Sequence, residues 1–125
     1  DSAVSRGLGD VYKRQGAFSS GSAKLTKKAR EIMQKIAKVS GKGAGQINVS
    51  GHTDDVPLIF GGQYRDNWDL AAARASSVVQ ELAKANTIPS DKLRAISFGE
   101  TRPIEQNDTK QGREKNRRIE IEIKY

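Results

Sequence analysis

The segment that most constrains the fold is the last stretch of the chain, residues 118–124, with the sequence Arg-Ile-Glu-Ile-Glu-Ile-Lys. Its apolar and charged residues alternate, and a period of two puts the three isoleucines on one face of an extended strand and the charges on the other. We therefore predict a β-strand here whose isoleucine face is buried. Such a strand requires a sheet that is covered on one face and solvated on the other.

Two segments upstream have the period of an amphipathic helix, and each is followed by a strand pattern. The first helix is expected to begin at Thr26, a suitable N-cap, and the second at Asp66 or Asn67. The predicted buried positions are Leu25, Ala29, Ile32, Met33 and Ile36 in the first, and Ala71, Ala75, Val78, Val79 and Leu82 in the second. Strands are predicted over residues 46–50 and 93–98, the latter with Ile96 and Phe98 on one face.

This order of elements predicts an α+β fold. A strand, a helix and a second strand in succession require a right-handed crossover and a parallel pair, whereas the final strand can pair antiparallel. Residues 107–116 form a polar loop in which we expect at most a short helix. Both main helices are expected on one face of a mixed sheet, which leaves the other face to water or to a partner.

Composition sets wide limits on function. The chain has 125 residues, enough for one domain. It has no cysteine and no apolar run of the roughly 18 residues that a membrane span needs. The net charge of +7 suits nucleic acid, an anionic envelope polymer or simple solvation. The lysines of the first helix fit either a surface that faces an anionic polymer or, more simply, a solvated helix face.

Candidate binding residues lie where the strand over 46–50 ends. Asp54 follows that strand, and Arg74 lies one turn into the second helix, with its stem on apolar surface and its head expected near solvent. A carboxylate and a guanidinium held apart on rigid elements suit a ligand that carries both an ammonium and a carboxylate, such as an amino acid. The alternative is an ordinary surface salt bridge, which would stabilise little. The loop over residues 56–66 either packs over a binding groove or covers an edge of the core.

Catalysis has little support in the sequence. His52 is the only histidine, no nucleophile stands beside it in a recognisable arrangement, and no second ligand completes a metal site. Glycines 41, 43 and 45 lack the Gly-Lys-Ser/Thr ending of a phosphate loop. We therefore predict no catalytic residue, no metal and no cofactor, and a structural role for His52. The aromatic residues form no stacking array, which argues against nucleic acid.

Motifs spread over nearly the whole chain resemble one known family, the OmpA-like peptidoglycan-binding domains. They are Gly51-His52-Thr53-Asp54, Asn67, Leu70, Arg74-Ala75, Phe98-Gly99-Glu100, Pro103, Asn107, Gly112-Arg113 and Asn116-Arg117-Arg118-Ile119-Glu120-Ile121. They follow one another in the order of the family. The continuation Asp55-Val56-Pro57, the loop to Asp66 and Asn67-Trp68 resemble the MotB-like branch found in flagellar stators.

The resemblance implies an OmpA-like sandwich: a mixed four-stranded sheet with two main helices packed on one face, in the order βαβαββ. It places the first strand and its turn at residues 16–22, although the glycines and serines there are more typical of a loop. Residues 1–15 fit no part of the family pattern. We interpret residues 1–15 as a disordered or foreign leader and residues 16–125 as the domain.

The resemblance also implies the function, which is noncovalent binding of peptidoglycan through its diaminopimelate stem peptide. By resemblance, Asp54 takes the ligand ammonium and Arg74 its carboxylate, and Thr53 and Asn67 belong to the same site. Arg117, like Arg118, lies beside the last strand and either adds positive potential to the site or bonds to loop carbonyls. Asn67 is expected to cap the helix as well. The family's usual serine after Leu70 is Ala71 here, so a hydroxyl contact from that position is lost.

The resemblance further implies a periplasmic domain of a Gram-negative bacterium that ties a membrane or motor protein to the wall. It would form a homodimer in the parent protein and reach the membrane only through an N-terminal anchor absent from this sequence. Three alternatives stay open: a general OmpA- or Pal-type envelope anchor, a basic nucleic-acid-binding domain, and a dimerisation domain without wall binding.

Overall fold

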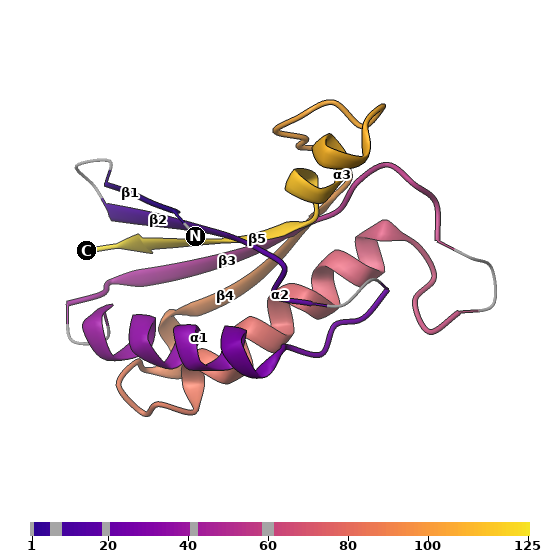
Figure 1. Cartoon of the computed structure of the whole chain (residues 1–125). Coiled ribbons are helices and arrows are strands. Elements are labelled where there is room, and N and C mark those ends of the chain that lie inside the picture. Colours follow the sequence, from indigo (N-terminus) through magenta and orange to yellow (C-terminus); the bar gives the residue numbers. More distant parts are fainter. Residues whose placement is uncertain (1, 6–8, 19–20, 41–42, 59–61) are drawn as a thin grey trace.

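The computed structural model describes residues 2–5, 9–18, 21–40, 43–58 and 62–125. Within them, five strands form one sheet in the order β1-β2-β5-β3-β4, with the helices against it (Figure 1). The elements in chain order are β1 (Ser2–Ser5), β2 (Gly9–Gln15), α1 (Lys27–Ser40), β3 (Gln46–His52), α2 (Asn67–Ala83), the 3-10 helix η1 (Ser90–Lys92), β4 (Leu93–Gly99), α3 (Lys110–Asn116) and β5 (Arg118–Lys124).

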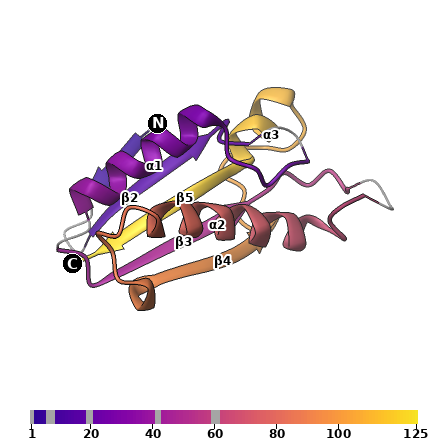
Figure 2. The same cartoon turned by 90° about the horizontal axis from the view of Figure 1, so that it is seen from below.

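The sheet is mixed, as the order of elements predicted. β3 and β4 are parallel neighbours joined through α2, and β5 pairs antiparallel with the other side of β3. Helices α1 and α2 both lie on the same face of the sheet, roughly along the strands (Figures 1 and 2). The opposite face carries no helix in the described part of the chain. The predicted α+β architecture, with the main helices on one face, is confirmed.

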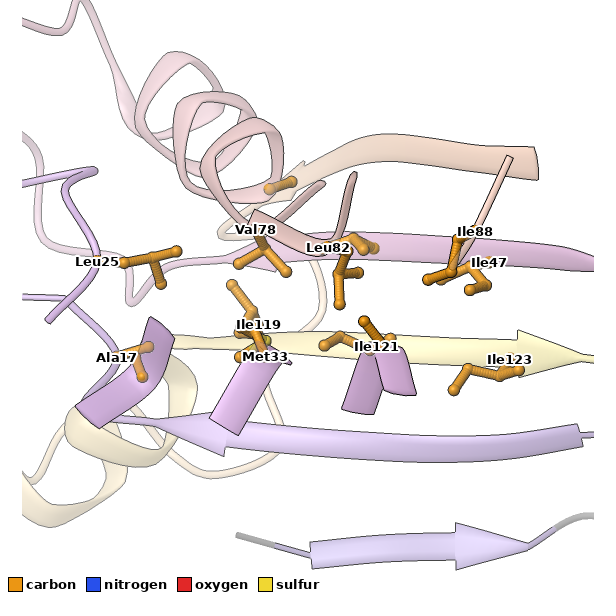
Figure 3. Packing of buried hydrophobic residues seen from close by; sticks show 14 of the residues in the cluster. Ala17, Leu25, Met33, Ile47, Val78, Leu82, Ile88, Ile119, Ile121 and Ile123 are labelled. Atoms are coloured by element: carbon orange, nitrogen blue, oxygen red, sulfur yellow. The ribbon is translucent and has the colours of Figure 1, made fainter. Parts of the chain in front are cut away.

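The core lies between this sheet and the two helices. The isoleucines of β5 are at most 1% exposed and meet Met33 of α1 and Leu82 of α2 (Figure 3). Burying one such aliphatic side chain stabilises the fold by about 1.5–3 kcal/mol. The predicted α1 start is also confirmed, because the Thr26 hydroxyl accepts a hydrogen bond from the backbone N–H of Ala29 at 3.2 Å.

One close contact fixes the distance between β3 and α2. A Cβ at Gly51 would lie 2.1 Å from the carbonyl oxygen of Ala71, so only glycine allows the strand and the helix to approach this closely. The contact lies three residues before Asp54 and three before Arg74. The strand end that carries Asp54 is thereby held against the first turns of α2.

The N-terminal expectations need correction. Residues 16–22 form no strand in their described part; Phe18 makes only an isolated bridge to Leu25. The strand next to β5 is β2, and β1 pairs with it, so the sheet has five strands rather than four. Residues 2–5 and 9–15, which we assigned to a leader outside the domain, form these two strands. The edge of β5 offers unpaired backbone groups, and an extended segment can pair with them without apolar periodicity. The foreign origin of this segment stays a prediction.

Strand β4 presents Leu93 to the core but Ile96 and Phe98 away from the helices. Ser97 donates from its hydroxyl to the Trp68 carbonyl of α2 at 2.8 Å, so the face of β4 that carries Ser97 is the helix face. Ile96 and Phe98 share the other face, as their alternation predicted, but that face is the open one. Phe98 stacks there on His52, with ring centroids 5.4 Å apart.

Candidate functional site

A pocket of about 500 Å³ lies at the carboxyl end of β3. Residues 53–58 follow β3, residues 62–66 lead into α2, and α3 lies above the start of β5 (Figure 1). These three parts of the chain and the loop before α1 enclose the pocket. Its lining residues are Gly21, Thr53, Asp54, Val56, Pro57, Leu58, Gly62, Gln63, Tyr64, Asn67, Leu70, Arg74, Arg113 and Arg117. All five residues predicted for the site are among them.

Asp54 lies on the pocket wall with its carboxylate held in place. Arg117 donates from Nη1 to Oδ2 at 2.6 Å, and the backbone N–H of Val56 donates to Oδ1 at 3.1 Å. Asp54 is only 7% exposed, so its carboxylate is buried, whereas the Arg117 side chain is 36% exposed. Arg117 adds positive charge to the pocket, as one expectation had it, and also makes the direct ion pair with Asp54.

Arg74 comes to the same pocket from α2 but is far more buried than expected. It is 4% exposed, its Nε donates to the carbonyl oxygen of Ser22 at 2.9 Å, and its guanidinium lies 5.4 Å from the Phe18 ring centroid. Burial lowers the pKa of Arg74, and so does the neighbouring Arg117, whereas Asp54 and Tyr64 raise it. The expectation that the Arg74 head stays near solvent was wrong, because the loop before α1 folds over it.

Asn67 and Thr53 shape the pocket wall through the backbone. Asn67 donates from Nδ2 to the carbonyl oxygens of Asp54 at 3.3 Å and Val56 at 3.1 Å. The N-cap of α2 is instead Asp66, whose Oδ1 accepts from the N–H of Asp69 at 2.8 Å. The predicted capping role of Asn67 was therefore wrong, because its amide is committed to the loop.

Thr53 is fixed from both sides. Its N–H donates to the carbonyl oxygen of Gly99 at 2.8 Å, and its hydroxyl donates to the carbonyl oxygen of Asp54 at 2.8 Å. The single hydroxyl proton is thus already used within the protein. Thr53 positions the Asp54 backbone and still offers a hydroxyl lone pair as an acceptor.

The sequence reasoning missed Arg113 as a pocket residue, whereas Tyr64 belongs to the loop that was expected over a groove or over an edge of the core. Arg113 donates from Nη1 to the carbonyl oxygen of Asn107 at 2.9 Å, which fixes its side chain beside Arg117. Its position in the sequence could have indicated it, because Arg113 lies four residues before Arg117 and residues with that spacing are neighbours on a helix. Val56, Pro57 and Leu58 line the pocket as well, so this part of the loop packs over a groove. Ile59 and Phe60 lie outside the described residues.

His52 lies on the open face of the sheet, away from the pocket. Its Nε2 is 2.9 Å from the Ser50 hydroxyl and 3.8 Å from a Glu120 carboxylate oxygen. These contacts, with the stacking on Phe98, agree with the structural role expected for it. Among the described residues, no three acidic or histidine side chains come together in a way that could hold a metal ion. None of the described helices is both long and apolar enough to cross a membrane.

Relatives of known sequence share much of this chain. Residues 17–117 match the model of the OmpA family. The uncharacterized protein YtxE of Bacillus subtilis is 36% identical over 95% of this chain and 49% of its own length. Motility protein B of the same bacterium is 32% identical over 96% of this chain and 46% of its own length. The peptidoglycan-binding protein ArfA of Mycobacterium bovis is 32% identical over 86% of this chain and 31% of its own length.

Solved structures agree in fold. The periplasmic domain of Helicobacter pylori MotB superposes with a TM-score of 0.83 at 29% identity, covering 99% of this chain and 88% of that one. The cell wall anchor of the type VI secretion system from Pseudomonas aeruginosa superposes with a TM-score of 0.89 at 29% identity, covering 98% and 86%. The chain spans about half the length of the first two curated relatives. From its sequence, fold and motifs, the chain belongs to the OmpA family.

Proposed function

We propose that this chain binds peptidoglycan noncovalently through the free end of a diaminopimelate stem peptide and so anchors its parent protein to the cell wall. The observation that carries the proposal is the joint position of the Asp54 carboxylate and the Arg74 and Arg117 guanidiniums on one pocket. The names of its relatives point the same way, because they include a peptidoglycan-binding protein and a cell wall anchor.

The charges of the pocket suit a zwitterionic end group. The Asp54 carboxylate has about four acceptor positions, of which Val56 and Arg117 use two, so it can still accept from an ammonium. Arg117 has five N–H donors and a side chain that is 36% exposed, so it can donate to a ligand carboxylate while it holds Asp54. Arg74 adds a second positive charge in a poorly hydrated position, where its attraction for an anion is stronger than in water.

A single domain of this kind binds with modest affinity. Each charge-assisted hydrogen bond contributes about 1.5–3 kcal/mol, so two or three of them give a dissociation constant on the order of micromolar to millimolar. A wall polymer offers many stems, and a parent protein with two such domains gains avidity without any new contact. The homodimer and the periplasm of a Gram-negative bacterium belong to this proposal as well.

Co-sedimentation with insoluble diaminopimelate-type peptidoglycan tests the proposal. We expect the wild-type domain to pellet at both low and moderate salt, because its contacts are specific and partly screened from water. Asp54→Asn and Arg74→Ala should each reduce pelleting about tenfold or more, since each removes one charged partner of the ligand.

Matched controls are Asp91→Asn and Arg94→Ala, which change the same charges at exposed positions that do not line the pocket. Circular dichroism establishes that each variant is folded. Wild-type binding that both pocket variants retain would refute the site. If all four variants pellet like the wild type and salt abolishes the pelleting, then binding to the wall depends only on the net charge of +7. A parallel DNA-binding assay with a steep salt dependence would then favour a nucleic-acid partner.

A further inference from the structure

The charges around the pocket are unequal in number. Three guanidiniums line it, those of Arg74, Arg113 and Arg117, and the acidic residue among its lining residues is Asp54. At neutral pH the side chains that line the pocket therefore carry a net charge of +2. One ammonium and one carboxylate from a ligand would leave that excess unchanged. A ligand end that brings one more negative charge than positive would lower the excess positive charge of the pocket from +2 to +1.

Arg113 is the guanidinium that the zwitterionic end group does not use. Arg113 donates a hydrogen bond to the Asn107 carbonyl oxygen. It makes no ion pair with a carboxylate in the described part of the chain. It is partly exposed and lines the pocket. The remaining N–H groups of its fork are thus available for a bidentate contact with a carboxylate.

The position of Arg113 is fixed by the backbone around it. The N–H of Arg117 donates to the Arg113 carbonyl oxygen at 3.1 Å, so the two residues lie one helical turn apart on the same side of α3. Asn107, which accepts from Arg113, is itself held by Asn116 at 2.8 Å. A Cβ at Gly112 would lie 1.9 Å from the Gln106 carbonyl oxygen, so α3 is packed tightly on the loop before it. A guanidinium on such a support binds with little loss of side-chain entropy.

We infer that Arg113 is a specificity-determining residue that selects stem-peptide ends with two free carboxylates and one free ammonium. This inference rests on the proposed function and names the charge state of the ligand. Asp54 takes the ammonium, Arg74 and Arg117 take the carboxylate next to it, and Arg113 takes the carboxylate at the end of the peptide chain. A stem whose terminal carboxyl is amidated lacks the second carboxylate and binds more weakly.

Two synthetic tripeptides test this inference. Both are L-alanyl-γ-D-glutamyl-diaminopimelate with the free side-chain amino and carboxyl groups; one ends in the chain-terminal carboxylate and the other in the carboxamide. Isothermal titration calorimetry at low salt should give the wild-type domain about a tenfold preference for the carboxylate form, the size of one charge-assisted hydrogen bond. Arg113→Gln should reduce that preference to near one, by weakening only the carboxylate form.

Lys115→Gln is the matched control, because it removes one positive charge from the same helix at an exposed position outside this pocket. It should keep the tenfold preference. Equal wild-type affinity for the two peptides, or equal weakening of both by Arg113→Gln, would overturn the inference and leave the proposed function standing. Absence of binding to either peptide, together with wall pelleting that Asp54→Asn does not change, would overturn both.

Discussion

Replacing Asn116, the last residue of α3, by alanine should strongly destabilise the domain. Asn116 is completely buried and makes four hydrogen bonds between 2.8 and 3.0 Å. Its Oδ1 accepts from the N–H groups of Ile104 and Glu105, and its Nδ2 donates to the Glu105 carbonyl oxygen and to Asn107. One side chain therefore ties the loop after β4 to the end of α3.

The magnitude follows from that geometry. Four bonds at about 0.5–1.5 kcal/mol each give about 2–6 kcal/mol. Glu105 and Ile104 are exposed at the surface, so the freed backbone groups of this loop can regain some water, and we expect about 3 kcal/mol. With a slope of about 2 kcal/mol per molar urea, the unfolding midpoint should fall by about 1.5 M.

Urea unfolding followed by circular dichroism measures this shift. The control is Asn48→Ala on the open sheet face, where a partly buried amide makes two side-chain contacts, and we expect a loss of about 1 kcal/mol or less. A loss for Asn116→Ala no larger than that of Asn48→Ala would refute the reasoning.

Asn116→Asp separates hydrogen bonding from packing. It keeps the two bonds accepted by Oδ1 but turns an oxygen toward the Glu105 carbonyl, where only a donor fits. Burial then raises the folded-state pKa of the new carboxyl above its unfolded value of about 3.9. Protonation restores a donor, so the variant should approach wild-type stability at acid pH and lose it as pH rises from about 4 through the folded pKa. A destabilisation independent of pH would mean that the amide acts through its shape alone.

Three further perturbations follow from the same structure. Gly51→Ala should lower stability by about 2 kcal/mol or more in thermal unfolding, because its Cβ would meet the Ala71 carbonyl, and an unchanged melting temperature would contradict that contact. Asp66→Ala should cost about 1 kcal/mol by loss of the α2 N-cap, measured by urea unfolding. Arg74→Lys should weaken wall pelleting about tenfold even though the charge is kept, because lysine lacks the guanidinium fork; full binding would show that charge alone suffices.

The strands and helices of the centre of the chain could be predicted from the sequence because their side chains repeat with the period of the element. The strand predicted over residues 118–124 is β5 with the same bounds, and its three isoleucines are in the core. The strand predicted over 46–50 extends to His52, and the one over 93–98 extends to Gly99. Their last residues are held by pairing with neighbouring strands, a signal that periodicity does not contain.

The N-terminal strands could not be predicted in this way. β2 pairs with β5 along seven residues through backbone hydrogen bonds. Such pairing requires an unpaired edge of β5 and no particular side-chain pattern. Nor could the sequence predict which face of the sheet carries Ile96 and Phe98. Alternation says that two residues share a face but not which face the helices cover.

For the candidate site, the sequence indicated five of the residues that line the pocket, and the tertiary structure decided how they pair and which others join them. The motifs placed Asp54 after a strand and Arg74 in the following helix, and both do line one pocket. Only the fold brought Arg117, which is 63 residues away in the chain, to 2.6 Å from Asp54. The fold also covered Arg74 with the loop that contains Ser22, and it added Arg113 to the pocket. Periodicity and local motifs encode the environment of each residue along its own element. Ion pairs between distant elements arise from the packing of the whole chain, and they set the charge that a ligand meets.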